Sequence, residues 1–292
     1  MPEFGLIGHP IEHSQSPVLF EAAYNGKYSY DLIRGEVFEE SYAKFLKGYR
    51  AVNVTAPFKE KAYAKADIVS GPVALTGAAN ILVNTPDGVS AYNSDFTGVI
   101  LTVADALFPG IVREFYGSFG AKAHVKVHQF VRDQLAERYG RRPAALVAGL
   151  GGAGKAAALA AAEMGFATTV MNRTAAKADE FVKGLPEYGF RVAPIGAFRE
   201  ELRQADLVVY ALPKALDCFT ELCPDDFSTG KPIVLEANYR NPAFSGLLLA
   251  RMLDAGAKYL PGKLWLVGQA VSGYSVMTGE TPDMEALMSL QA

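Results

Sequence analysis

Two polar motifs in the first hundred residues carry the side chains best suited to proton transfer. Lys59 ends the run NVTAPFK (residues 53–59), and Asp95 lies within YNSDFTG (residues 92–98). An ammonium group and a carboxylate at one polar site can pass a proton to or from the oxygen of an alcohol or a ketone. Taken alone, a lysine after Pro-Phe is ordinarily a solvated residue at a helix start. The hypothesis therefore depends on the two motifs occurring together.

A glycine-rich turn predicts a binding site for a dinucleotide. The sequence GLGGAG at residues 149–154 matches G-x-G-x-x-G and lies between an apolar strand at 144–148 and an Ala-rich helix that reaches about residue 164. The first glycine permits a tight turn, the second lets the backbone approach a pyrophosphate, and the third allows the helix to pack closely on the strand. The alternative is an ordinary glycine-rich loop, which the strand-turn-helix context disfavours. The residues assigned to the cofactor are Gly149, Gly151, Gly152, Ala153 and Gly154.

The end of the following strand indicates which dinucleotide is bound. NAD sites usually place an Asp or Glu there to bind the ribose 2′-hydroxyl. This chain has Asn172, Arg173 and Thr174 at that position, with Lys177 one helical turn later. The two cations would attract a 2′-phosphate that a carboxylate would repel, so the sequence favours NADP over NAD. The alternative interpretation is a helix N-cap at Thr174 with solvated basic neighbours.

The order of the expected elements predicts an α/β protein with two domains. Short strands are expected at 4–8, 28–33 and 51–55, followed by a hairpin whose strands at 81–84 and 89–92 flank Pro-Asp-Gly. Helical segments lie between them, as in an open α/β domain. From Ala144 onward the order of strands and helices is that of a Rossmann-type, doubly wound dinucleotide-binding domain.

Composition excludes several classes of protein. The chain has 292 residues, of which half are hydrophobic and a fifth are charged, as in a folded soluble protein. Its net charge of -3 gives no basic field for nucleic acid. We found neither an apolar run long enough for a membrane span nor a secretory signal. Cys218 and Cys223 are the only cysteines, which argues against a disulfide scaffold and for a reducing cytoplasm.

Taken together, these motifs resemble the shikimate dehydrogenase family, and the resemblance covers nearly the whole chain. It is carried by the two polar motifs, the glycine turn, SQSP at residues 14–17 and LVGQA at residues 266–270. The resemblance implies reversible, NADPH-dependent reduction of 3-dehydroshikimate to shikimate in aromatic amino-acid biosynthesis. It also implies that Lys59 donates or accepts the proton, and that Asp95 polarises Lys59 and binds a neighbouring hydroxyl.

The resemblance further implies a substrate pocket of hydroxyl and amide groups. Ser14 and Ser16 match the Ser-x-Ser pair with which the family binds the substrate carboxylate, and hydroxyl donors next to a helix N-terminus suit an anion. Alternatively, Ser16 is simply the N-cap of the helix that begins with Pro17. Each further pocket position would be an ordinary polar residue outside its motif. These positions are Thr55, Asn80, Tyr239 and Gln269.

The implied domain arrangement places the active site in the cleft between two domains. Residues 1–108 and 262–292 would form the substrate-binding domain, because the C-terminal segment packs back on the first domain in the family. Residues 144–261 would form the NADP-binding domain, with residues 109–143 as an inserted helical connection. Gly262, where the C-terminal helical segment begins, is also assigned to the cofactor site. We expect a monomer or a homodimer.

Several features depart from the family pattern. The family usually has Asn-Thr-Asp where this chain has Ser94 before Asp95. A common Asn-Ala-Thr-Ser stretch is replaced by YALP at residues 210–213, and Trp265 stands where a methionine is usual. The interval between Asp95 and Gly149 is also longer than in the family. Its excess, at about 109–143, has seven Lys or Arg against three Asp or Glu, with apolar residues at helical spacing.

Two alternative functions remain open. The nearer one is a quinate/shikimate dehydrogenase that uses NAD. The other is a non-catalytic regulator that binds the same ligand, although such a sensor would not need both Lys59 and Asp95. No metal is expected: His124 and His128 are four residues apart, as a metal pair could be, but the sequence offers no third ligand for them.

Overall fold

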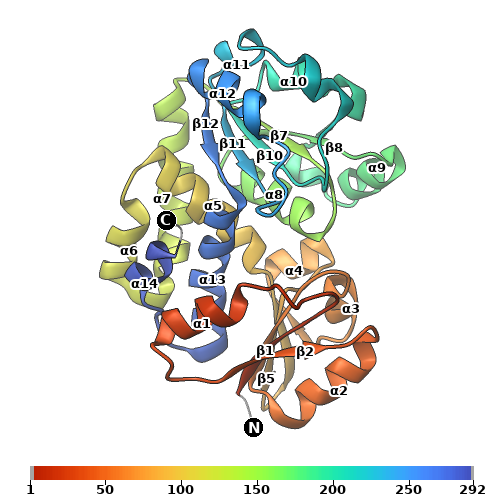
Figure 1. Cartoon of the computed structure of the whole chain (residues 1–292), viewed down its shortest axis with the longest axis vertical. Coiled ribbons are helices and arrows are strands. Elements are labelled where there is room, and N and C mark those ends of the chain that lie inside the picture. The colour runs from red at the N-terminus through yellow and green to blue at the C-terminus, as the bar shows by residue number, and fades with distance from the viewer. Residues whose placement is uncertain (1–2, 291–292) are drawn as a thin grey trace. The chain divides into compact units, whose positions relative to one another are not determined.

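The computed structural model describes residues 3–290, with the main chain only for Ala121, and the chain divides into two compact units. The first unit contains the residues up to Gly98, Tyr116–Lys122 and the segment from Val267 onward. The second contains Val99–Phe115 and Ala123–Leu266. Each unit is built around its own six-stranded sheet (Figure 1). The predicted α/β class is therefore confirmed.

The sheet of the first unit is mixed. Its order is β2-β1-β3-β5-β6-β4, in which β1 pairs in parallel with β2 and β3, whereas β5 pairs antiparallel with β3 and β6. The hairpin predicted around Pro-Asp-Gly is the β5–β6 pair, and Gly88 takes a positive φ of 119° at its turn. The strands are β1 (Phe4–Gly8), β2 (Tyr30–Arg34), β3 (Ala51–Val54), β4 (Ile68–Val69), β5 (Ile81–Thr85) and β6 (Gly88–Tyr92).

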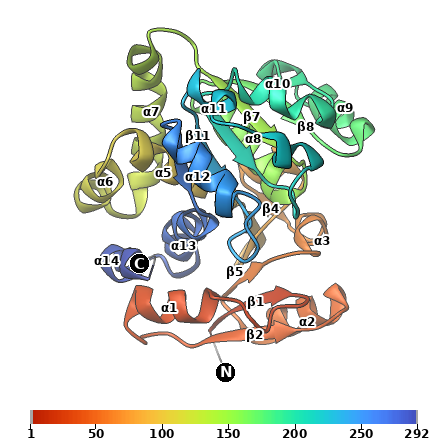
Figure 2. The same ribbon diagram turned by 45° about the horizontal axis from the view of Figure 1, so that its top comes forward.

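Helices pack on this sheet through aromatic and aliphatic side chains. Phe38 and Phe45 on α2 are fully buried in the same core as Val52 and Leu82 of the sheet. On another side of the unit, α14 packs against α1, as the two ribbons in Figure 2 show. The helices of this unit are α1 (Ser16–Tyr24), α2 (Phe38–Gly48), α3 (Lys59–Ala64), α4 (Gly71–Thr76) and α14 (Met284–Ser289).

The sheet of the second unit is parallel throughout. Its order is β12-β11-β10-β7-β8-β9, which is the doubly wound Rossmann order with β7 as the first strand. The strand order reverses between β7 and β10, and ligands of such sheets bind at the carboxyl ends of the strands at this point. The strands are β7 (Ala144–Ala148), β8 (Ala167–Met171), β9 (Arg191–Val192), β10 (Leu207–Tyr210), β11 (Ile233–Glu236) and β12 (Lys258–Leu260).

The second unit has an aromatic core. Tyr210 and Phe244 are fully buried, and their rings meet edge to face at 5.5 Å. Its helices are α7 (Ala123–Tyr139), α8 (Gly152–Glu163), α9 (Ala175–Lys183), α10 (Phe198–Leu202), α11 (Asp225–Ser228) and α12 (Gly246–Asp254). Short 3-10 helices occur in the two units at Gly120–Lys122, Pro186–Tyr188, Ile195–Ala197 and Asp217–Glu221.

The chain passes from one unit to the other inside three helices and once more between Lys122 and Ala123. The three helices are α5 (Ser94–Leu107), α6 (Ile111–Phe119) and α13 (Gly262–Thr278). The segment at 109–143 consists of α6, a 3-10 turn and α7. On α7, Val127, Val131 and Leu135 are buried at the expected helical spacing. Phe130 packs edge to face on Phe108 at 5.1 Å. The helix expected in this segment is therefore present, and it is packed into the second unit.

Among residues 3–290, none of the helices combines the length and the apolar composition that crossing a bilayer requires.

Candidate active site

Lys59 and Asp95 form an ion pair inside the first unit. Lys59 is the first residue of α3, Asp95 lies in the first turn of α5, and Lys59 Nζ donates to Asp95 Oδ2 over 2.5 Å. The two side chains are only 18% and 5% exposed. A lysine held in this way keeps a fixed position for its ammonium group while remaining accessible, as proton transfer requires. The pair predicted from the two motifs is therefore assembled.

Hydrogen bonds to amide side chains fix the start of α5. Asn80 exchanges two bonds with Ser94: its Oδ1 accepts from the Ser94 backbone over 2.8 Å, and its Nδ2 donates to the Ser94 hydroxyl over 3.1 Å. Asn93 Oδ1 accepts from the Asp95 backbone over 3.1 Å. Asn80, Asn93, Ser94 and Asp95 are all buried. The serine that replaces the family's usual threonine keeps the hydroxyl that this network uses.

Thr55 connects β3 to the lysine motif through its backbone. Its N–H donates to the Ile7 carbonyl over 2.9 Å, and its carbonyl accepts from the Phe58 N–H over 3.0 Å. A Cβ on Gly8 would lie 2.3 Å from the Thr55 side-chain methyl, so only glycine fits there. Thr55 is half-buried and lies four residues before Lys59.

Close packing brings Gln269 of α13 next to α5. A Cβ on Gly98 would lie 2.8 Å from the Gln269 backbone nitrogen. Four residues along α13, a Cβ on Gly273 would lie 3.0 Å from the Ser94 hydroxyl. The two glycines let the helix backbones approach, so Gln269 lies beside the first turns of the helix that carries Asp95.

Ser14 and Ser16 lie together immediately before α1. Ser14 Oγ donates to Ser16 Oγ over 3.1 Å and accepts from the Ser16 backbone over 3.2 Å. The expectation that Ser16 caps the helix is wrong. The N-cap is Gln15, and Ser16 is already the first helical residue, because the Ser14 hydroxyl satisfies its free N–H. Both serines are half-buried, and hydroxyl groups of this kind can donate to an anion.

Reasoning from the sequence missed Tyr30 and Tyr274, which hydrogen-bond Ser16, and Asn53, which accepts from Tyr30. The Tyr274 hydroxyl donates to the Ser16 carbonyl over 3.2 Å, and the Tyr30 hydroxyl donates to Asn53 Oδ1 over 2.7 Å. Burial raises the pKa of both phenols well above the ordinary value, against hydrogen bonds with the Ser16 side chain that lower it. Asn53 lies within the lysine motif and could have been noticed, whereas no pattern links Tyr30 or Tyr274 to Ser16.

The glycine turn of the second unit has the geometry that its motif predicts. Gly149 follows β7 with φ of 97°, a conformation that side chains disfavour. A Cβ on Gly154 would lie 1.8 Å from the Gly149 carbonyl, so the third glycine is sterically required. Around the exposed Gly151, by contrast, a Cβ would meet nothing within 4 Å. The turn with Gly152 and Ala153 thus leads into the N-terminus of α8 with space for a ligand.

Asn172 joins this turn to the end of β8. Its Oδ1 accepts from the Leu150 backbone over 3.2 Å, and its Nδ2 donates to the Thr174 carbonyl over 3.0 Å. Thr174 occupies the N-cap position of α9, but its side chain makes no capping bond. Arg173 and Lys177 are exposed on the same loop and the first turn of α9. Two cations beside a phosphate-binding turn suit a dinucleotide with an additional 2′-phosphate.

A buried carboxylate holds the loop that carries Tyr239. Glu236 at the end of β11 is fully buried and accepts from the backbone N–H groups of Ala243 and Phe244 and from the Tyr259 hydroxyl. Tyr239 is half-buried and belongs to the second unit, unlike the other expected substrate residues. The role of Glu236 was not expected, since a glutamate at a strand end has no distinctive pattern.

Gly262, Trp265 and the YALP stretch also lie in the second unit. A Cβ on Gly262 would lie 2.7 Å from the Ala237 carbonyl, so α13 begins in close contact with the end of β11. Trp265 is buried in the first turn of α13. The Tyr210 hydroxyl donates to the Lys214 carbonyl over 2.6 Å, which fixes the turn that contains Leu212 and Pro213.

The insertion histidine His128 contacts the end of α8. His128 Nε2 lies 3.1 Å from the Glu163 carbonyl at the end of α8. Within residues 3–290, no three side chains of the metal-binding types His, Cys, Asp and Glu are grouped so that they could hold an ion.

The chain is similar along nearly its whole length to proteins of one family. The family model described as "Shikimate dehydrogenase substrate binding domain" matches residues 6–82. The shikimate dehydrogenase (NADP(+)) of Archaeoglobus fulgidus is 33% identical over 297 residues, covering 96% of this chain and 94% of that protein. The corresponding protein of Rubrobacter xylanophilus is 29% identical, covering 97% and 93%.

Solved structures agree with the sequence relatives. The crystal structure of Mycobacterium tuberculosis shikimate dehydrogenase has a TM-score of 0.74 at 26% identity and covers 99% of this chain and 98% of its own. Shikimate 5-dehydrogenase from Thermus thermophilus, in complex with NADP(H) and shikimate, has a TM-score of 0.73 at 26% identity with the same coverage. With a relative above 30% identity over nearly the full length of both chains, the protein belongs to the shikimate dehydrogenase family.

Proposed function

We propose that this protein is an NADP-dependent shikimate dehydrogenase, which reversibly reduces the ketone of 3-dehydroshikimate to the alcohol of shikimate. It is an oxidoreductase of the CH–OH group and serves aromatic amino-acid biosynthesis. The observation that carries the proposal is the short, largely buried bond from Lys59 to Asp95. It lies in a unit that matches the family's substrate-binding domain over residues 6–82.

Lys59 is the proton donor in the direction of reduction. Reduction of a ketone adds hydride at carbon and a proton at oxygen, and Lys59 Nζ supplies the proton to that oxygen. Asp95 accepts a hydrogen bond from the ammonium group and so fixes the direction of that group, and the carboxylate can also accept from a neighbouring substrate hydroxyl. In the direction of oxidation, the neutral amine takes the proton back.

The other polar groups of the first unit bind and orient the acid. The Ser16 hydroxyl, and the Ser14 hydroxyl after its proton turns away from Ser16 Oγ, donate to the substrate carboxylate beside the N-terminus of α1, which also favours negative charge. Thr55, Asn80 and Gln269 supply hydrogen bonds to the substrate's other polar groups. From the second unit we assign Tyr239 to the substrate as well. We further propose that residues 1–108 and 262–292 form the substrate-binding domain.

The second unit fits NADP. Residues 144–261 form the cofactor-binding domain, with 109–143 as an inserted connection. The open space at Gly151 and the N-terminus of α8 suit a pyrophosphate, while Arg173 and Lys177 suit a 2′-phosphate. The other residues assigned to the cofactor are Gly149, Gly152, Ala153, Gly154, Asn172, Thr174 and Gly262. The bound cofactor supplies the hydride.

Steady-state assays that cross two acids with two cofactors test the proposal. Shikimate and quinate are each measured with NADP and with NAD. We expect the shikimate–NADP pair to have by far the highest kcat/KM. Preference for quinate with NAD would instead assign the chain to the quinate/shikimate branch. Tight binding of shikimate without turnover would mean that the chain is a non-catalytic regulator.

We also propose a cytoplasmic enzyme that acts as a monomer or a homodimer. Cys218 and Cys223 are free thiols, as is usual in a reducing compartment. Sedimentation equilibrium of the purified chain distinguishes the two assembly states, and a larger oligomer would contradict both.

A further inference from the structure

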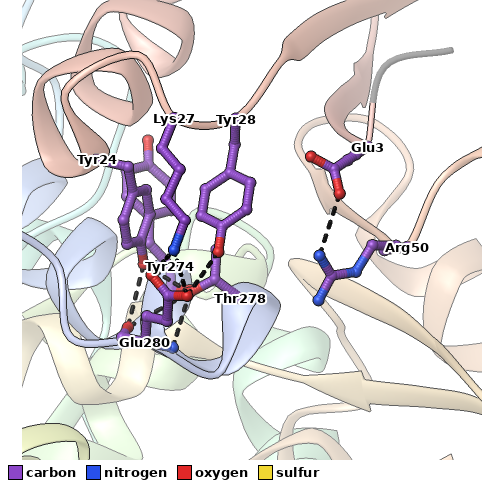
Figure 3. Close-up of polar contacts among 8 residues, drawn as sticks. All are labelled: Glu3, Tyr24, Lys27, Tyr28, Arg50, Tyr274, Thr278 and Glu280. Atoms are coloured by element: carbon purple, nitrogen blue, oxygen red, sulfur yellow. Dashed lines mark hydrogen bonds and ion pairs between the residues drawn. The ribbon is translucent and has the colours of Figure 1, made fainter.

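The helix α1 is held at both of its ends by the C-terminal part of the first unit. At its C-terminal end, the Tyr24 hydroxyl lies 2.8 Å from Thr278 Oγ1, and Tyr28 and Lys27 donate to the Glu280 carboxylate over 2.8 and 2.6 Å (Figure 3). At its N-terminal end, Tyr274 of α13 donates to the carbonyl of Ser16. The first residue of α1 is therefore tied to α13 by a side chain.

Phe20 provides the packing that places these tyrosines. The ring of Phe20, on α1, is fully buried, and its centroid lies 4.7 Å from those of Tyr274 and Tyr30 and 5.2 Å from that of Tyr24. Tyr274 and Tyr24 thus share one aromatic neighbour but direct their hydroxyls to different partners. Figure 3 shows both tyrosines with Thr278 and Glu280.

The Tyr274 hydroxyl keeps its proton over the working range of pH and can therefore donate a hydrogen bond throughout. Its side chain is 3% exposed, and burial raises its pKa far above the working range of pH, so that it stays protonated. It has one proton, which it gives to the Ser16 carbonyl over 3.2 Å. A hydrogen bond with the Ser16 side chain lowers this pKa, but burial outweighs it.

The loop before α1 is exposed over much of its length, although Ile11 is buried and the Ser16 side chain also hydrogen-bonds Tyr30. Glu12, His13 and Gln15 are exposed, and Ser14 and Ser16 are only half-buried. The Ser14 backbone donates to the Ile11 carbonyl over 3.0 Å, but this bond is internal to the loop. The contact from Tyr274 comes from outside the loop and acts on the main chain of Ser16, so it fixes the position from which both serine hydroxyls point.

We propose that Tyr274 is a positioning residue for substrate recognition, whose hydroxyl sets the place of the Ser14–Ser16 pair and thereby the affinity for the substrate carboxylate. This inference rests on the proposed function. It assigns Tyr274 no contact with substrate. The Tyr274 hydroxyl acts through the Ser16 carbonyl, and it affects only the binding of the substrate's carboxylate group.

The test compares Tyr274→Phe with Tyr24→Phe. Both changes remove one buried phenolic hydroxyl and keep the ring that packs on Phe20, but only Tyr274→Phe loses the bond to Ser16. We expect Tyr274→Phe to raise the KM and the directly titrated Kd for shikimate about 5- to 10-fold, with less than about a twofold change in kcat and in the KM for NADP. Tyr24→Phe should lower Tm and leave the KM for shikimate unchanged.

The KM for an uncharged substrate distinguishes a role in carboxylate recognition from a purely structural role. With the methyl ester of shikimate, which lacks the charged carboxylate, Tyr274→Phe should have the same KM as the wild type. An equal rise in KM for acid and ester, or an equal effect of the two tyrosine changes, overturns the inference. If Tyr274→Phe does not fold, Tyr274→Met fills the site without a hydroxyl and serves the same comparison.

Turnover of the wild-type protein shows whether a failed test refutes the proposed function or only the role of Tyr274. Absence of wild-type turnover with shikimate and NADP would refute the proposed function and the inference with it. A wild type that is active, with Tyr274→Phe unchanged in its KM for shikimate, would refute only the role of Tyr274.

Discussion

Lys59 and Asp95 are separated by 36 residues in the sequence, yet Lys59 Nζ and Asp95 Oδ2 lie 2.5 Å apart, because two helices begin at the same place. Lys59 starts α3, and Asp95 lies in the first turn of α5. A helix N-terminus favours the carboxylate and disfavours the ammonium group, so Asp95 compensates for the unfavourable position of Lys59.

The first prediction concerns this pair. Lys59→Met keeps most of the side-chain volume but removes the proton donor, so kcat should fall about 100-fold or more, with a smaller change in the Kd for shikimate. Lys61→Met, an exposed residue of the same helix, is the control and should retain wild-type kcat. Turnover near the wild-type rate in Lys59→Met would remove Lys59 from the mechanism.

The second prediction concerns the choice of cofactor. Arg173→Ala should raise the KM for NADPH and leave that for NADH nearly unchanged, because a charge-assisted bond to the 2′-phosphate contributes about 1.5–3 kcal/mol. Lys183→Ala removes an exposed cation at the far end of α9 and should change neither constant. Equal weakening of both cofactors by Arg173→Ala would mean that the arginine supports the loop instead.

The third prediction concerns the carboxylate. Ser14→Ala should raise the Kd for shikimate roughly tenfold, as expected for loss of a hydrogen bond to a charged group, and leave the Kd for NADP unchanged. The methyl ester of shikimate lacks the carboxylate charge, so Ser14→Ala should raise the Kd for the ester far less than the Kd for shikimate. The neighbouring exposed residue gives a control, Gln15→Ala, with wild-type binding expected. If Ser14→Ala raised the Kd for the acid and for the ester equally, Ser14 would not bind the carboxylate.

The fourth prediction separates two glycines of one turn. Gly154→Ala places a methyl group 1.8 Å from the Gly149 carbonyl, so it should destabilise the protein by about 1–3 kcal/mol or more. Gly151→Ala meets nothing within 4 Å and should keep the wild-type Tm. Its methyl group would occupy the space assigned to the pyrophosphate, so the KM for NADP should rise. A normal KM in Gly151→Ala would place the cofactor elsewhere.

The fifth prediction concerns stability in acid. Burial alone would raise the pKa of Asp226, but hydrogen bonds from Arg199, from Cys223 and from Arg203 outweigh it and lower the pKa to about 2. Because the folded pKa lies below the unfolded value near 4, the ionised carboxylate stabilises the fold above pH 4. That contribution, about 2 kcal/mol, is lost as the pH falls from about 4 to about 2.

Denaturant titrations of the wild type and Asp226→Asn measure this effect. The difference in unfolding free energy between them should be large at pH 7 and should shrink between pH 4 and pH 2. A difference that does not vary with pH over this range would contradict the lowered pKa.

The sequence by itself determined the local features and the family. The glycine spacing, the two polar motifs and the hairpin turn each depend on a few neighbouring residues, whose backbone conformations or hydrogen bonds are set locally. Likewise, the apolar spacing of Val127, Val131 and Leu135 fixed the buried face of α7. The placement of Ser16 as an N-cap was wrong, because Gln15 takes that position and the Ser14 hydroxyl accepts from the Ser16 N–H.

The tertiary structure decided which distant residues support the site. Tyr274 reaches Ser16 across 258 residues, and the approach of α13 to α5 depends on Gly98 and Gly273. Glu236 holds the Tyr239 loop by accepting from the backbone N–H groups of Ala243 and Phe244. Such contacts follow no spacing in the chain, because they arise only when packing in the core places a side chain against a backbone group from another element.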